Sequence, residues 1–136
     1  MRGTCASLRG IHGADEFPVD VFKIARGLGV VVLTKRWRGL PHAVCYHPFK
    51  LVLLNSARPL CSQRFDLAHE LAHYVLGVEK YHTCAANQFA AELLMPAHVF
   101  RLEALVHGVD GYVSELFGVS ETAVQQRMKE LRHGFG

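Results

Sequence analysis

The chain has 136 residues, enough for one domain that buries its own hydrophobic core. Half of its residues are hydrophobic, and the formal net charge of +3 comes from basic residues that are scattered along the chain. This balance favours neither nucleic acid nor a membrane surface as the partner. Nine histidines are a high number for this length and direct attention to metal or proton chemistry.

Glycines and acidic residues interrupt the apolar residues near the N-terminus, so a secretory signal peptide is not expected. No apolar stretch approaches the length of a membrane span. The cysteines lack CxxC spacing, which is typical of a reducing compartment. They are Cys5, Cys45, Cys61 and Cys84. We therefore expect a cytoplasmic protein with no membrane partner.

The first half of the chain predicts one helix followed by strands. Residues 1–16, rich in glycine and small residues, are expected to form a loose lead-in. A helix is predicted after Pro18, with Gly29 as its stop. Short β-branched or alternating runs predict strands, the last two joined by a turn at 47–50 into a hairpin. These strands are 30–33, 43–46 and 51–55.

The second half of the chain predicts helices only. Ser62 is a plausible N-cap for a helix over 63–76, which Gly77 ends. Further helices are predicted over 84–95 and 96–106, followed by two short segments separated by Gly118. The order indicates a single α+β domain, 1–136, with helices on one side of a small mixed or antiparallel sheet. Residues 109–136 form its helical, helix-turn-helix-like C-terminal extension.

The sequence His69-Glu70-Leu71-Ala72-His73 is the strongest chemical signal in the chain. Positions four apart lie on one face of a helix, so both imidazoles can point at one metal ion. Zinc accepts imidazole nitrogens and keeps a position open for water when the protein supplies three ligands. Glu70 can then act as the general base toward that water. The sequence therefore predicts a zinc-dependent peptidase with its motif on an active-site helix.

The segments RFDLAHELAHYVLG and ANQFAAELLMP, between Arg64 and Pro96, resemble the ImmA/IrrE family of bacterial and phage metallopeptidases. Upstream, PVDVFKIARGLGVVV and LVLLN are similar to the same family, so the resemblance covers most of the chain from Pro18 onward. It implies a zincin-like fold, a cytoplasmic enzyme, and cleavage of a helix-turn-helix transcriptional repressor in a stress response.

The chain departs from that family at the third metal ligand. The resemblance places a glutamate three residues before the pair Ala86-Asn87, where this chain has Thr83. A threonine hydroxyl is a poor zinc ligand. We favour His82 as the substitute because it is one residue away and imidazole is the commonest metal ligand.

Other donors near that position remain open. Cys84 would bind zinc as a thiolate, and Glu79 follows His73 by six residues, a spacing that other zinc peptidases use. Glu92 lies too far along its helix and is expected to be a surface residue. Manganese is an alternative to zinc, because two imidazoles suit several divalent ions.

Two further segments have an expected role. The strand at 51–55 is the expected edge against which an extended substrate would bind, although no individual substrate-binding residue is predicted. The segment SELFGVSETAVQQRMKEL, from Ser114, resembles a helix-turn-helix. Its obvious cations are only Arg127, Lys129 and Arg132, which favours a helical hairpin that completes the core over a DNA-binding unit.

Two functions are compatible with these residues. The first is a zinc endopeptidase that hydrolyses a peptide bond in a protein partner. The second is a degenerate zincin-like module that binds a protein partner or DNA without cleavage, which Thr83 favours. The intact His69, Glu70 and His73 favour the enzyme, because a module without activity has little need of Glu70.

Overall fold

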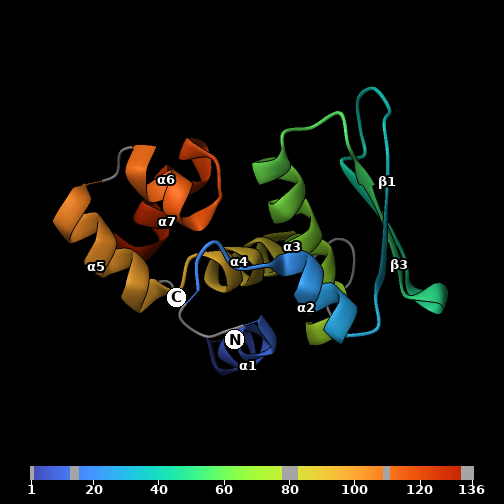
Figure 1. The fold of residues 1–136 in the computed structure, drawn as a ribbon, viewed down its shortest axis with the longest axis horizontal. Coiled ribbons are helices and arrows are strands. Elements are labelled where there is room, and N and C mark those ends of the chain that lie inside the picture. The colour runs from blue at the N-terminus through green and yellow to red at the C-terminus, as the bar shows by residue number, and fades with distance from the viewer. Residues whose placement is uncertain (1, 13–15, 78–82, 109–110, 133–136) are drawn as a thin grey trace.

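The structure is a computed structural model, and it describes residues 2–12, 16–77, 83–108 and 111–132. Two helices come first, the strands of one small sheet follow them, and the rest of the described chain is helical (Figure 1). The elements in chain order are α1 (Arg2–His12), α2 (Val21–Gly27), β1 (Val31–Lys35), β2 (Ala43–Tyr46), the 3-10 turn η1 (His47–Phe49), β3 (Leu51–Asn55), α3 (Leu60–Leu76), α4 (Thr83–Leu94), α5 (Ala97–His107), α6 (Gly111–Phe117) and α7 (Glu121–Arg132). The predicted α+β class is confirmed.

The sheet is mixed and has the order β1-β3-β2. β1 runs parallel to β3, whereas β2 runs antiparallel to it with Tyr46 opposite Leu51. The predicted hairpin is confirmed, and Lys50 in its turn adopts a positive φ of 46°. The predicted edge position of 51–55 is wrong: β3 is the central strand, because β1 crosses over to pair with its other side. Within the described residues, β1 and β2 are the edges.

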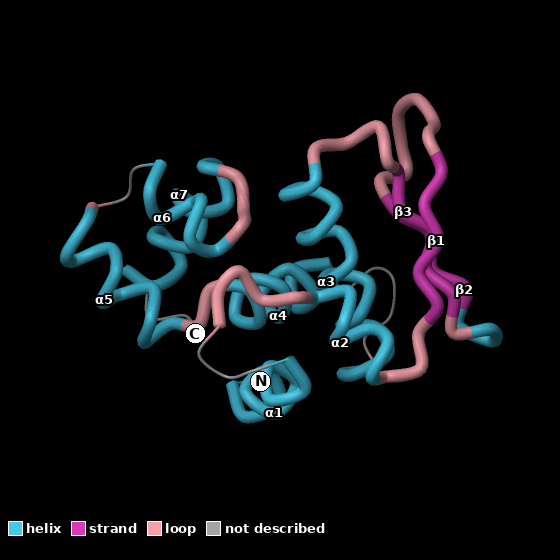
Figure 2. Tube along the Cα trace, in the orientation of Figure 1, coloured by secondary structure: helices cyan, strands magenta, loops and turns pink. Residues whose placement is uncertain are grey.

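Helices cover one side of the sheet, and the C-terminal helices lie beyond them, away from the sheet (Figures 1 and 2). On β3 the side chains of Val52 and Leu54 are fully buried, while those of Leu51 and Leu53 are half-buried. This alternation is what a strand with one covered face requires. α3 packs on this covered face and on α4, so the motif helix is held between the sheet and the helical half.

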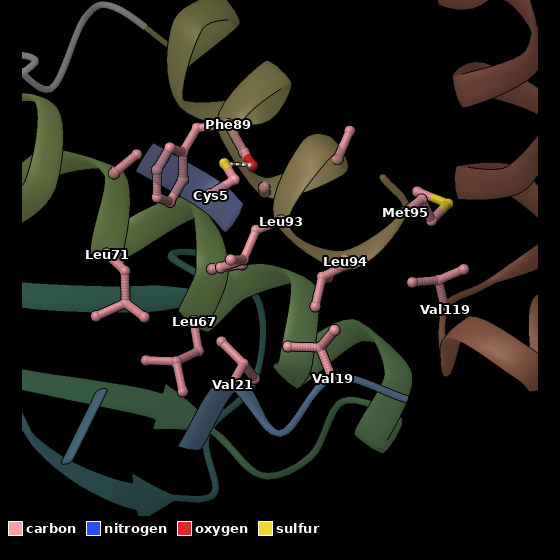
Figure 3. Packing of buried hydrophobic residues seen from close by; sticks show 14 of the residues in the cluster. Cys5, Val19, Val21, Leu67, Leu71, Phe89, Leu93, Leu94, Met95 and Val119 are labelled. Atoms are coloured by element: carbon pink, nitrogen blue, oxygen red, sulfur yellow. Dashed lines mark hydrogen bonds between the residues drawn. The ribbon is translucent and has the colours of Figure 1, made fainter. Parts of the chain in front are cut away.

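The core is built around α3 and α4 (Figure 3). Leu67 and Leu71 of α3 and Phe89 and Leu93 of α4 are fully buried. Complete burial of side chains of this size is worth about 1.5–3 kcal/mol each, so these two helices fix the position of the motif firmly.

The N-terminal segment differs from the predicted loose lead-in, because residues 2–12 form the helix α1. Cys5 is fully buried, and its thiol donates to the carbonyl oxygen of Phe89 at 3.8 Å (Figure 3). The guanidinium of Arg9 donates to the carbonyl oxygen of Glu92 at 2.9 Å. Contacts with α4 therefore stabilise a helix whose own glycines do not predict one.

Buried polar groups attach the C-terminal helices to the core. Arg127 of α7 is 2% exposed, donates to the carbonyl oxygen of Met95 at 3.0 Å, and forms an ion pair with Glu92 of α4. The expectation that Glu92 is a surface residue is wrong, since it is 3% exposed. An i, i+4 pattern does not reveal this burial, because the covering residue comes from a helix more than thirty positions later.

The turn between α6 and α7 lies against the start of the domain. Gly118 has a φ of 63°, and a Cβ there would approach Pro18 Cβ and Arg64 Nε at 3.0 Å. Buried Arg64 donates to the carbonyl oxygens of Val19, Phe117 and Gly118 at 2.6, 3.3 and 3.0 Å. Only glycine fits this left-handed, crowded position, as the predicted turn requires.

Candidate active site

The motif lies in the C-terminal half of α3, which begins at Leu60 after Pro59 instead of after the predicted cap Ser62. Gly77 ends the helix with a φ of 65°, as predicted. His69 and His73 are neighbours on one face, with ring centroids 5.5 Å apart. His73 is 5% exposed, whereas His69 and Glu70 are half-buried. Helical periodicity therefore brings the rings of His69 and His73 together, as the sequence predicts.

Asn87 of α4 fixes the ring of His69. Its Oδ1 atom lies 2.7 Å from Nδ1 of His69. An amide oxygen only accepts, so Nδ1 is the donor in this contact, and in a neutral imidazole Nε2 is then the nitrogen with the lone pair. This is the arrangement found where a second residue orients a metal-binding histidine. The sequence alone does not predict this role of Asn87, because no spacing rule links α4 to a ring on α3.

Tyr74 connects the motif helix to the hairpin. Its hydroxyl accepts from the Cys45 thiol at 3.1 Å and donates to the carbonyl oxygen of Tyr46 at 3.3 Å. Burial, with the hydrogen bond to Cys45 and the charge of Glu70, raises the pKa of Tyr74 above its ordinary value. The hydroxyl therefore stays protonated at neutral pH and holds β2 beside the motif.

His47 also belongs to this region, although the sequence analysis assigned it only to a turn. Its ring stacks on Tyr74 with centroids 4.5 Å apart and lies 6.2 Å from the ring of His73. The contact arises because the hairpin turn folds over the C-terminal part of α3.

A groove runs between the start of β2 and the motif helix. It has a volume of about 750 Å³, within the range of small-molecule sites. On the helix side it is lined by Phe65, Asp66, His69, Glu70 and Asn87, and on the strand side by Leu40, Pro41, His42 and Ala43. The predicted metal ligand His69 and the predicted base Glu70 thus face an open cleft, next to the free edge of β2.

The third metal ligand is not found among the described residues. His82 and Glu79 lie in 78–82, outside the described residues. Cys84 is exposed, and its sulfur accepts from the side-chain amide of Gln88 at 3.8 Å. No group of three His, Cys, Asp or Glu side chains suited to a metal occurs within the described ranges. Of the predicted donors, His69 and His73 are the two that the described part of the chain places side by side.

The C-terminal helices do not present the basic face that DNA binding requires. The helix-turn-helix-like outline is present, since Gly118 separates α6 from α7 and the Ser120 hydroxyl accepts from the amide of Ala123 at 3.1 Å. Arg127, however, points into the core. Of the three cations that the sequence offered, only Lys129 and Arg132 are exposed.

The fold and the helix-borne motif define a metallopeptidase-like module. The IrrE N-terminal-like domain family, Peptidase_M78, matches residues 25–129, and the chain belongs to this family. No curated protein matches the chain. The resemblance seen in the sequence is thereby confirmed.

A solved structure described as a Mycobacterium tuberculosis transcriptional regulator shares the fold, with a TM-score of 0.74 and 14% sequence identity. The match covers 94% of this chain and 46% of the regulator, so this chain corresponds to somewhat less than half of that protein. Among the described helices, none has the length and apolarity needed to span a membrane.

Proposed function

We propose that this protein is a zinc-dependent endopeptidase that hydrolyses a peptide bond in a protein partner. The observation that carries the proposal is the hydrogen bond between His69 and Asn87, which prepares the ring for a metal at the wall of an open groove. Family membership supports a peptidase, and the motif supplies its general base.

His69 and His73 would hold the metal through their ring nitrogens. When bound, zinc would lower the pKa of a water molecule and polarise the scissile carbonyl. We propose His82 as the third ligand, with Cys84 and Glu79 as the alternatives, and manganese as the alternative metal. The exposure of Cys84 leaves its thiol free to move, but its sulfur faces Gln88 in the present arrangement.

Glu70 would act as general base. Glu70 lines the same groove as His69. The next two residues of the helix, Leu71 and Ala72, are fully buried in the core. Glu70 would take a proton from the attacking water and deliver it to the leaving amine, which is why a carboxylate is needed at this position.

An extended peptide would bind along β2. This strand pairs with β3 on one side only within the described residues, and Ala43 at its start lines the groove. Main-chain hydrogen bonds to a free strand edge hold a peptide in a sequence-tolerant way. β2 therefore takes the role that the sequence analysis assigned to 51–55.

We propose a helix-turn-helix transcriptional repressor as the protein partner and the cytoplasm as the location. Both follow from the family resemblance, and the similar solved structure, titled a transcriptional regulator, is compatible with a regulatory setting. A degenerate module that only binds its partner is the second candidate. The observation that favours it is Thr83 in the place of the family's glutamate.

Replacement of Glu70 by Gln distinguishes the two candidates. The amide cannot accept the proton, so cleavage of a peptide or repressor substrate should fall by about 10²–10⁴-fold while zinc is retained. Glu115→Gln, an exposed change of the same type on α6, is the matched control. Equal activity of the Glu70 variant and wild type would reject the peptidase.

A further inference from the structure

Positive charge is concentrated in one part of the chain, contrary to the scattered distribution expected from its overall balance. Residues 21–65 contain no aspartate or glutamate. They contain eight basic residues: Lys23, Arg26, Lys35, Arg36, Arg38, Lys50, Arg58 and Arg64. This segment comprises α2, the sheet and the beginning of α3, and it forms the strand side of the candidate active site. A net charge of only +3 for the whole chain conceals it.

Two of these cations have partners within the protein. Arg64 is buried on backbone carbonyl oxygens. Arg58 forms an ion pair with Asp66 at 2.9 Å, and its Nη1 atom lies 3.1 Å from Nε2 of His42. Lys35, Arg36 and Arg38, in contrast, are exposed, and no ion pair with them is formed by the part of the chain that the structure describes. They are free to meet an external anionic group.

These three exposed cations lie close together in the chain, at the end of β1 and in the loop 36–42, which leads into β2. Figure 2 shows this loop at the same end of the sheet as the beginning of α3. Arg38 lines a cavity of about 350 Å³, and Leu40 and His42 line both this cavity and the groove of the candidate active site. The basic loop is therefore a continuation of that groove.

The loop is held in place by specific hydrogen bonds. The side chain of Asn55, which is 3% exposed, accepts from the amide of Trp37 at 3.2 Å and donates to its carbonyl oxygen at 3.0 Å. Trp37 Nε1 donates across the loop to the carbonyl oxygen of Pro41 at 2.7 Å. A loop that is already ordered by these hydrogen bonds loses little conformational entropy when a ligand binds.

We propose that the basic loop 36–42, together with Lys35, binds an acidic segment of the protein substrate. This inference rests on the proposed function, because it takes β2 as the strand that holds the peptide. A peptide that extends past Ala43, at the start of β2, passes directly beside the loop. Glutamate or aspartate side chains at that end of the peptide meet Arg36 and Arg38, while its centre reaches Glu70.

An acidic peptide fits this surface better than a nucleic acid does. Lys35 at the end of β1 and the two arginines of the loop neutralise few phosphates, whereas DNA binding normally uses many. The aromatic residue of the loop, Trp37, is half-buried, and its ring N–H group donates a hydrogen bond to the carbonyl oxygen of Pro41. Its ring is therefore not fully exposed for stacking with a nucleic-acid base. The groove beside it also lies next to an edge strand of the described sheet, β2, along which an extended peptide can pair.

The test measures binding without cleavage, in the full chain carrying Glu70→Gln. Three fluorescein-labelled peptides of equal length and identical apolar centre carry Glu, Gln or Lys residues at one end. Fluorescence anisotropy should show about tenfold tighter binding of the Glu peptide than of the Gln peptide, with the Lys peptide weakest. The preference should shrink as salt is added, because the loop is exposed.

The double variant Arg36→Glu/Arg38→Glu should abolish this preference. Arg101→Glu/Lys129→Glu changes the net charge equally, at exposed positions on α5 and α7, and should preserve it. Circular dichroism confirms that both variants fold. An equal loss in both would show that only net charge matters and would overturn the proposal.

Two other outcomes are informative. Absence of any charge preference in the parent chain overturns the proposal, as does binding of duplex DNA that depends on Arg36 and Arg38 while peptide binding does not. Cleavage by the wild-type chain is assayed separately with added zinc. Charge-selective binding without cleavage would reject the proposed function but retain the acidic-peptide surface, so the two failures are distinguishable.

Discussion

Asn87 on α4 accepts a hydrogen bond from His69 on α3 at 2.7 Å, and this contact joins the two central helices at the wall of the groove. It leaves Nε2 of His69 available to a metal ion. The geometry of the candidate metal centre therefore depends on a residue that lies outside the motif.

Asn87→Ala should lower zinc affinity by about 10–100-fold, because the ring of His69 loses its orientation and its fixed tautomer. Competition with a chelator measures the change. Gln88→Ala, the adjacent position on α4, is the control, since Gln88 contacts Cys84 and not His69. If both variants bind zinc as tightly as the wild type, Asn87 has no role in the site.

The buried pair of Glu92 and Arg127 should be important for stability. Both side chains are almost completely buried, and removal of Glu92 leaves the buried guanidinium of Arg127 with only the longer ion pair to Glu130 at 3.5 Å. Glu92→Leu should therefore reduce the free energy of unfolding by about 3 kcal/mol or more, measured by urea denaturation. Glu92→Leu/Arg127→Met should recover part of this loss.

The control for this prediction is Glu103→Gln. Glu103 pairs with His107 at 3.6 Å on α5, where both groups contact solvent. Its loss should change stability by less than about 1 kcal/mol. Equal effects of the two single substitutions would show that burial of the Glu92 pair is not what determines its energy.

The cysteines should differ sharply in reactivity. Burial raises the pKa of the Cys5 thiol from 9.0 to about 12, whereas Cys84 is exposed. Iodoacetamide at pH 8 should therefore modify Cys84 and leave Cys5 unmodified in the folded chain, as peptide mass spectrometry would show. Rapid modification of Cys5 under native conditions would contradict the packing of α1 on α4.

The same pKa shift predicts a dependence of stability on pH. The folded chain holds the thiol proton more tightly than the unfolded chain does. The contribution of Cys5 to stability is therefore complete below pH 9 and is lost as the pH rises from 9 toward 12. Cys5→Ser should remove this alkaline component from the urea midpoint measured against pH.

Local patterns predicted the hairpin and the motif helix well. Strands β2 and β3 have the predicted limits, because their short apolar runs and the turn at His47–Phe49 between them are local signals. Gly77 ends α3 as predicted, since a left-handed residue at a helix end needs only its own backbone.

Features that depend on distant contacts could not be predicted. α1 is stabilised by the burial of Cys5 and Leu8. The central position of β3 depends on a parallel pairing with β1, which no hairpin signal reveals. Asn87 on α4 contacts His69 on α3, which lies on a different helix. The position of the basic loop beside the groove likewise depends on the folded arrangement and not on a local pattern.

Zinc content and affinity of the purified, tag-free protein test the central claim most directly. The account predicts one tightly held zinc ion per chain, measured by elemental analysis and chelator competition, and its loss on His69→Ala or His73→Ala. Such a result would also require a third ligand, which replacement of His82, Cys84 and Glu79 in turn would identify. A chain that retains no zinc, or whose zinc affinity is unaffected by these histidines, would contradict the proposed metal centre.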